Sequence, residues 1–171
     1  FQNCPSLTSL SGIEGWNVGK VKTMDQFMNG CTSLTGELNL SSWNISNCVN
    51  FASALRNTGL TEINLTNWSP TTANTNMANM FRDNSSMSKL IAPTLVNANV
   101  NGLSYFLSKC SSLTSLDVSQ WDVSGSKDLS SMFADCSKLT SLDLRHWDVS
   151  GATNLTRLVQ NCSMLSDFKT N

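Results

Sequence analysis

Residues 132–151 read MFADCSKLTSLDLRHWDVSG, and residues 106–125 read FLSKCSSLTSLDVSQWDVSG. The hydrophobic residues, the cysteine, the tryptophan and the terminal glycine recur at the same places in both stretches. The period extends over the whole chain, because every tryptophan occupies one repeat position. The anchors of the units are Trp16, Trp43, Trp68, Leu95, Trp121 and Trp147. A fixed period of this length indicates an array of stacked units, in which no unit buries its apolar face alone.

The segment before each anchor has the periodicity of a β-strand. Apolar residues stand three and five positions before the anchor, as Leu144 and Leu142 do before Trp147, with polar residues between them. Such alternation is typical of a half-buried strand. The inward positions predicted by this rule are Ile13, Leu38, Leu40, Ile63, Leu65, Leu90, Ala92, Leu116, Val118, Leu142 and Leu144.

The segment after each anchor has a different spacing. After Trp121 the first apolar residue of the return is Leu129, and Met132 and Phe133 stand three and four positions after it. The other units repeat this spacing. Intervals of three and four predict one face of a short α-helix or a pair of 3₁₀ turns. We therefore predict an α/β solenoid with one parallel β-sheet and short helical or 3₁₀ returns. It comprises about six repeats of 25–27 residues in a single continuous array over residues 1–171.

The combined pattern M/F-F-x-x-C-x-x-L-x-x-L-D-L/V-x-x-W-D-V-S resembles a known family. It is similar to the 26-residue repeat of bacterial surface proteins, a BspA-like branch of the leucine-rich repeats. The resemblance is best over residues 103–168 and implies a cell-surface or secreted module without enzymatic activity, often linked to adhesion. Residues 87–102 depart from the pattern, since they lack the tryptophan and place Pro93 beside the strand.

Composition excludes several classes of function. The net charge is -1 and no polybasic stripe is present, so nucleic-acid binding has no electrostatic source. No apolar run approaches the length of a membrane span. Asn, Ser and Thr make up more than a third of the chain, which favours an extracellular or cell-surface location.

No enzymatic site and no cofactor are predicted. The chain has no glycine-rich phosphate loop after a strand and no zinc-binding spacing. His146 is the only histidine, and a triad with Asp148 and Ser150 is not expected because adjacent strand residues point to opposite faces. The position of His146 varies between repeats, which predicts a solvated surface residue. Asp122 and Asp148, after two anchors, are expected to cap turns through their side chains.

Five of the six cysteines recur at one repeat position. We expect this position to point inward as a structural ladder of mostly reduced thiols, in which Thr58 and Asn84 replace cysteine. A small polar side chain there can satisfy backbone groups of the turn. One disulfide such as Cys4–Cys31, or a metal site, remains an alternative, and Cys48 lies outside the ladder. The members of the cysteine ladder are Cys4, Cys31, Cys110, Cys136 and Cys162.

Seven Asn-x-Ser/Thr sequons occur, about as many as the composition predicts by chance. We expect Asn84 not to be glycosylated because it belongs to the inward ladder. Asn44, Asn67 and Asn154 fall in turns and are the candidate glycosylation sites, if the protein is made in a eukaryotic secretory pathway.

The outward positions of the predicted sheet form the candidate interaction face. A solenoid sheet offers a rigid surface whose residues vary without disturbing the core. The apolar pair Ile91 and Pro93 between polar neighbours is a candidate hot spot. The partner is expected to be a protein or glycan ligand, or copies of the protein itself. The residues of this face are Asn39, Asn64, Ile91, Pro93, Asp117, Asp143 and Arg145.

The alternative function is a structural subunit of a head-to-tail extracellular filament, with or without glycosylation. Phe1 begins at a return position and the last residues begin a new strand, so both ends are expected to be uncapped. An uncapped end leaves core residues and a strand edge in water, so we expect the segment to lie within a longer array or fibre.

Overall fold

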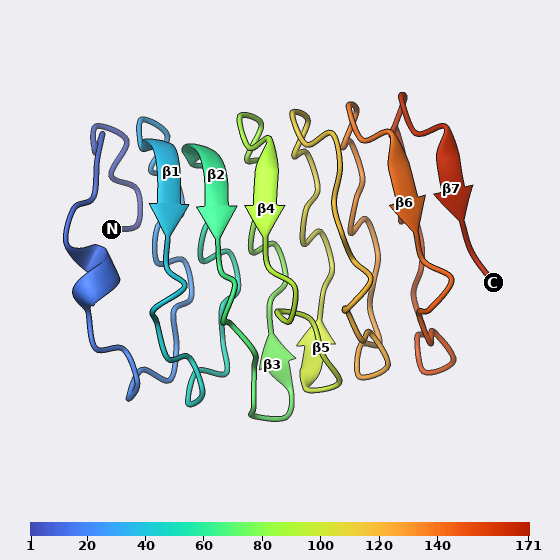
Figure 1. Ribbon diagram of the computed structural model, residues 1–171, viewed down its shortest axis with the longest axis horizontal. Helices are drawn as coiled ribbons and strands as arrows, with labels where there is room; N and C mark the ends of the chain where they lie inside the picture. The colour runs from blue at the N-terminus through green and yellow to red at the C-terminus, as the bar shows by residue number, and fades with distance from the viewer.

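The computed structural model describes residues 1–171 as a stack of similar coils, with the two termini at opposite ends (Figure 1). Three strands form one parallel sheet in the order β1-β2-β4, and two short parallel pairs, β3-β5 and β6-β7, complete the set. The bounds are β1 Thr35–Asn39, β2 Gly59–Asn64, β3 Thr75–Asn76, β4 Lys89–Ile91, β5 Val100–Gly102, β6 Ser141–Asp143 and β7 Asp167–Lys169.

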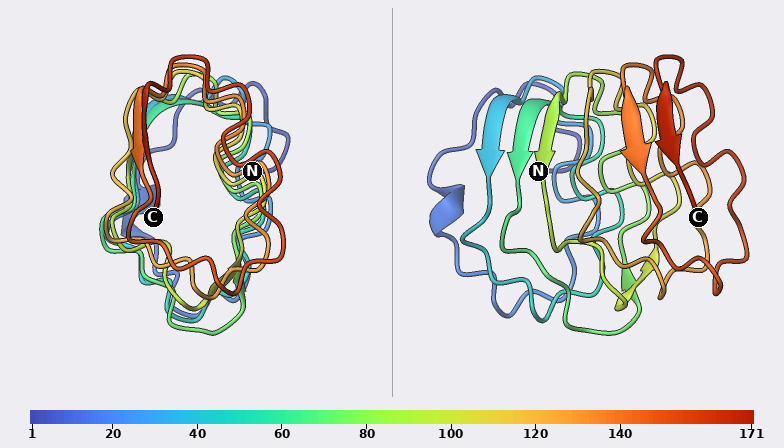
Figure 2. Two further views of the ribbon diagram at one scale, coloured as in Figure 1. Left: turned by 90° about the vertical axis from the view of Figure 1, so that its right-hand side faces the viewer. Right: turned by 45° about the vertical axis from the view of Figure 1, so that its right-hand side comes forward.

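Each coil pairs with the next in parallel register. Ile63 of β2 pairs with Leu90 of β4, and Leu142 of β6 pairs with Phe168 of β7. On the opposite side, isolated bridges run from Thr23 to Asn50 to Asn76 and from Gly102 to Asp128 to Asn154. Viewed along the axis, the coils superimpose on one oval outline (Figure 2). The protein is therefore a parallel β-solenoid, and the predicted repeat architecture is confirmed to that extent.

The predicted helical returns are wrong. The only helix is η1, a single 3₁₀ turn at Ile13–Gly15. In the second coil, Phe27 N–H bonds Met24 O within the coil, whereas Gln26 N–H bonds Ala52 O of the next coil. N–H groups thus alternate between a turn in their own coil and a ladder to the next one. Such a chain of turns also brings inward residues at intervals of three and four, so the spacing did not distinguish it from a helix. The leucine-rich-repeat-like α/β class is not supported.

The returns depend on left-handed backbone conformations at two fixed positions. Residues there have positive φ angles in coil after coil, which no continuous helix tolerates. The first position is held by Gln26, Ser53, Asn79, Tyr105, Ser131 and Arg157, and the second by Asn3, Gly30, Asn57, Asp83, Lys109, Asp135 and Asn161. These two left-handed ladders turn the chain while leaving its hydrogen bonds free to reach the neighbouring coil.

The core is one continuous cluster that runs the length of the solenoid. The predicted inward positions of the strand segments are buried, except for Leu116, which is half-buried. Trp43 and Trp68 stack with ring centroids 6.2 Å apart. The indole of Trp68 also donates to Leu40 O of the preceding coil at 2.8 Å, and those of Trp43 and Trp121 make the equivalent bond, so these three anchors each tie two coils together. Trp16 departs from the prediction, because 49% of it is exposed in the first coil.

The sheet is interrupted, which corrects the prediction of one continuous sheet. No backbone hydrogen bond joins residues 7–15 to 34–42, 88–93 to 114–119, or 115–119 to 141–146. Only β1-β2-β4 and β6-β7 are paired on this side; in Figure 1 the one arrow between β4 and β6 is β5, which lies lower, beside β3. We call the side formed by these strands and by residues 9–15, 114–120 and 140–146 the sheet face.

The coils at both ends expose apolar side chains that interior coils bury. Phe1 and Trp16 are exposed at one end, and Val149, Leu155 and Phe168 at the other. The structure contains no helix with the length and apolar character needed to cross a membrane.

Candidate interaction face

The predicted outward residues do lie on the sheet face, and most of them also shape the turn that follows. Asn39, Asn64, Asp117 and Asp143 occupy equivalent positions, and each accepts the backbone N–H of the residue two places later at 2.9–3.1 Å. This local bond fixes the side chain, because a short Asn or Asp can mimic a backbone turn. Ile91 holds the same position without a polar group, so it leaves an apolar site in a polar row.

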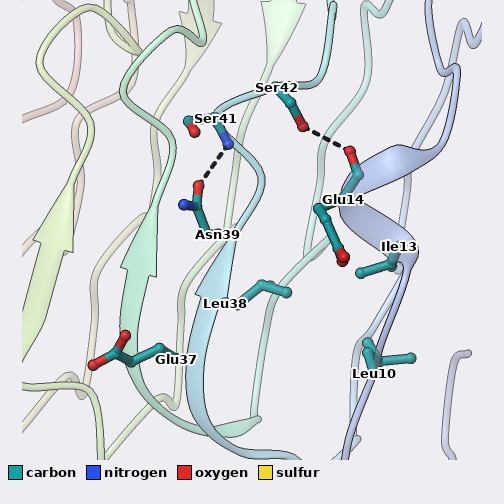
Figure 3. Close-up of a pocket in the computed structure, with 8 residues that line it drawn as sticks. All are labelled: Leu10, Ile13, Glu14, Glu37, Leu38, Asn39, Ser41 and Ser42. Carbon is teal, nitrogen blue, oxygen red and sulfur yellow. Dashed lines mark hydrogen bonds between the residues drawn. The ribbon is translucent and has the colours of Figure 1, made fainter.

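Groove A lies at the first break of the sheet, between the first coil and β1 (Figure 3). It has a volume of about 390 Å³. Figure 3 shows Leu10, Ile13 and Leu38 pointing toward the space between the two coils, with the carboxylate of Glu14 beside them. Glu37 also belongs to the lining, but its carboxylate points from β1 toward β2, away from the first coil. The groove therefore has an apolar floor with the carboxylate of Glu14 beside it.

Grooves B and C lie on either side of the unpaired segment 115–119. Groove B, about 280 Å³, separates it from the β4 coil, and its lining includes Ile91, Pro93, Leu116 and Asp117. Groove C, about 110 Å³, separates it from the β6 coil and is lined by Asp117, Val118, Ser119, Asp143 and His146. The structure thus brings Ile91, Pro93 and Asp117 together in groove B, and Asp117 and Asp143 in groove C.

Charges on the sheet face are mostly acidic and only partly paired. Lys89 bonds Glu62 at 2.8 Å, Arg145 bonds Asp143 at 2.6 Å, and Lys169 bonds Asp167 at 2.9 Å. The Arg145 guanidinium lowers the pKa of Asp143, and the hydrogen bonds from Ser119 lower the pKa of Asp117. Glu14, Glu37 and Asp117 form no ion pair with a lysine or arginine. Each of these three residues belongs to the lining of a groove.

The cysteine ladder lies at a corner of the coil, and its thiols are not joined in disulfides. Cys31, Cys110, Cys136 and Cys162 each donate a hydrogen bond to a backbone carbonyl of the preceding coil at 3.0–3.2 Å. Cys4 is exposed in the first coil. Burial raises the pKa of Cys110 and raises that of Cys136 to about 12. Cys110 and Cys136 therefore act as neutral donors between coils.

Thr58 and Asn84 continue this ladder with stronger hydrogen-bonding groups. Asn84 is fully buried, and its Nδ2 donates to Leu55 O at 2.7 Å. Its Oδ1 accepts from the Thr58 N–H at 2.7 Å and from the Thr58 hydroxyl at 2.9 Å. Cys48 is also buried, although it lies at a different corner of the coil.

The remaining predicted residues lie away from the grooves or at their edge. Asn44 and Asn67 are exposed and Asn154 is half-buried, and the Asn67 amide donates to Ser41 O at 3.0 Å. Asp122 and Asp148 cap turns by accepting the N–H of Ser124 and Ser150, both at 2.9 Å.

His146 is exposed as predicted by its variable position, but its ring is not free. Nε2 donates to Val118 O at 2.7 Å. At the equivalent positions of other coils, the carbonyls of Ile13, Leu40 and Ala92 accept the indole N–H groups of Trp43, Trp68 and Trp121. The repeat therefore predicts that Val118 O accepts the indole N–H of Trp147. The Trp147 indole N–H is accordingly buried without a partner.

Sequence reasoning did not predict groove A as a recess: of its lining, Asn39 belongs to the predicted face, whereas Leu10 and Glu37 were not assigned to any site. A signal was present at Gly36, which has a φ of 83° and precedes a shift of register between β1 and β2. A glycine inside a strand marks a local irregularity of the sheet, and Gly36 is the second residue of β1.

Comparison with protein families gives two successive matches that cover residues 1–96 and 94–170, as expected for a repeated array. Neither the curated proteins nor the solved structures give a match. Because the two matches span nearly the whole chain, the protein belongs to the family described as Mycoplasma protein of unknown function, DUF285.

Proposed function

We propose that the protein is a non-enzymatic recognition scaffold of the cell surface or extracellular space, and that it binds a protein or glycan ligand on its sheet face. The observation that carries the proposal is groove B. It sets the apolar side chains of Ile91 and Pro93 into a recess of about 280 Å³ rimmed by polar groups. Apolar anchors surrounded by a polar rim are the usual centre of a binding surface.

The rigidity of the face supports the same role. Asn39, Asn64, Asp117 and Asp143 are held by bonds to their own turns, so little side-chain entropy is lost when a ligand contacts them. The similarity of the repeat to BspA-like surface proteins supports the location and the adhesive role. Asn44 and Asn67 are exposed outside the grooves, so glycans at these sites would leave the face open.

A head-to-tail structural subunit is the second candidate, favoured by the apolar side chains on both end coils. We give it second place because it assigns no role to the grooves.

The test is selection of ligands on the folded protein, from a random peptide library and from an array of extracellular glycans. Each ligand obtained is then measured against two variants of one coil. Ile91→Arg fills groove B with a charged side chain and is expected to abolish binding. Ala98→Arg places the same side chain at an exposed position of that coil outside the grooves, and is expected to leave binding unchanged. Ligands that ignore both variants would show that the sheet face is not the binding surface.

A further inference from the structure

The charge of the sheet face differs from that of the rest of the protein. Six acidic residues (Glu14, Glu37, Glu62, Asp117, Asp143, Asp167) and three basic residues (Lys89, Arg145, Lys169) lie on it, a net charge of -3. The net charge of the whole chain is only -1, so the rest of the molecule has a net charge of +2. The acidic character is therefore concentrated on one side.

The three basic residues are already occupied. Each is bonded to an acidic partner at 2.6–2.9 Å, which removes Glu62, Asp143 and Asp167 from further pairing. Glu14 and Glu37 at groove A and Asp117 between grooves B and C are left without a basic partner. Unpaired carboxylates beside apolar recesses match a ligand that combines a positive charge with an apolar stem.

Lysine and arginine side chains have this combination. Their methylene stems can lie on apolar surface while the charged head stays at the edge in contact with an anion. The floor of groove A, formed by Leu10, Ile13 and Leu38, would take the stem, and Glu14 beside it would take the head. At groove B, Ile91 and Leu116 supply the floor and Asp117 the carboxylate.

The spacing of the two grooves sets the spacing of the ligand. Groove A lies between the first and second coils and groove B between the fourth and fifth, which is three coil steps. At about 4.8 Å per step the grooves are roughly 14 Å apart along the solenoid axis. An extended peptide rises about 3.3 Å per residue, so residues four apart span roughly 13 Å and project from the same side. We propose, building on the proposed recognition role, that the sheet face binds an extended basic peptide that crosses the strands and places Lys or Arg at positions i and i+4 in grooves A and B.

A glycan fits the face less well. The linings of grooves A and B hold no aromatic ring on which a sugar could stack, and the unpaired carboxylates need a cationic partner. Nucleic acid is disfavoured by the same negative charge.

The experiment measures fluorescence anisotropy with the labelled peptide Ser-Lys-Ser-Thr-Ser-Lys-Ser, whose lysines are four residues apart. The protein is used as the full 171-residue chain. We expect saturable binding. It should weaken when the salt concentration is raised, because partly exposed ion pairs are screened by salt. The peptide Ser-Lys-Ser-Thr-Lys-Ser-Ser has the same composition but places its lysines three apart, on opposite sides of the extended chain. It is expected to bind about fivefold more weakly, the loss of one ion pair of about 1 kcal/mol.

The variants Glu14→Gln and Asp117→Asn remove one carboxylate from each groove. Asp117→Asn keeps the turn, because asparagine makes the same bond at Asn39 and Asn64. Each variant is expected to weaken binding about fivefold, and the double variant by about the product of the two. Asp148→Asn is the matched control, since it changes the net charge equally at a turn away from the grooves, where Asn44 already serves in a sister coil.

Equal binding of both peptides, or equal effects of Asp117→Asn and Asp148→Asn, would overturn the proposal. The recognition role has its own test. If the ligands selected on the sheet face are glycans, or peptides without a basic pair, the recognition role stands and the basic peptide is refuted as its ligand. Failure of all selected ligands to respond to Ile91→Arg would refute both.

Discussion

Replacing Asn84 is the sharpest test of how the coils are held together. Asn84→Leu keeps the approximate size of the side chain and removes its amide. Three hydrogen bonds are lost, one to Leu55 O and two from Thr58, in a position with no solvent exposure. Each bond contributes about 1 kcal/mol, and a buried group left without a partner costs about 1–3 kcal/mol. We expect the free energy of unfolding to fall by about 3–5 kcal/mol.

Two further variants separate the contributions. Asn84→Cys introduces the residue found at five other rungs, whose thiol can donate to Leu55 O as Cys110 does to Phe81 O. It is expected to cost only about 1–2 kcal/mol. Thr58→Val removes one hydroxyl and is expected to cost about 1 kcal/mol. The double variant Thr58→Val/Asn84→Leu should cost less than the sum of the single changes, because the hydroxyl left unpaired by Asn84→Leu is then absent.

Equilibrium unfolding in urea, followed by tryptophan fluorescence, gives these differences. The losses are small enough for a domain of ordinary stability, about 5–15 kcal/mol, to remain folded in water. A loss below about 1 kcal/mol for Asn84→Leu, or strict additivity in the double variant, would show that the polar rung does not tie the coils together.

Three other predictions follow from the same structure. Trp121→Ala removes a side chain that is 2% exposed, together with its hydrogen bond to Ala92 O. The free energy of unfolding in urea should fall by about 3–5 kcal/mol, whereas replacing the exposed Gln120 by Ala should change it little. Equal losses would refute the inward position of the anchor. Lys109 has a φ of 65°, so Lys109→Val should be less stable than Lys109→Gly by about 1 kcal/mol, a difference that thermal melting can detect and that a right-handed backbone would abolish. Burial raises the pKa of Cys136 from 9.0 to about 12, so this thiol stabilises the fold fully below pH 9 and progressively less as the pH rises toward 12. The free energy of unfolding should therefore fall with pH over this range, and Cys136→Ala should make that fall less steep. An equally steep fall in Cys136→Ala would contradict the buried position.

The period and the inward positions could be predicted from sequence because they depend on residue type alone. Leu142 and Leu144, or Met132 and Phe133, must be buried in any fold that stacks identical units. The conformation of the returns could not be predicted, since intervals of three and four are shared by helices and by consecutive turns. A partial signal existed in the second left-handed ladder, where Asn, Gly or Asp occupies every position except Lys109. The first ladder, with Ser53, Tyr105 and Arg157, gave no such signal.

The candidate site was predictable only in part. Ile91 and Pro93 differ from the residues at the same positions of other repeats, so their apolar character is visible in the sequence. The breaks that create the grooves are not, because residues 115–118 show the same alternation as the paired strands β2 and β6. Whether two strands bond depends on how neighbouring coils settle against each other, which no single repeat encodes.

The nearly constant separation of bonded partners has a consequence for how the chain folds. Bonds between coils join residues 24–30 positions apart, from Gln2–Gln26 at one end to Ser166–Thr140 at the other. Adding one coil to a formed neighbour therefore requires closing a loop of about 26 residues, an entropic cost of about 3 kcal/mol that is the same at every step. Growth can begin at any coil and proceed in both directions, and its rate per coil does not fall as the array lengthens. A unit gained or lost by recombination would leave this folding route unchanged.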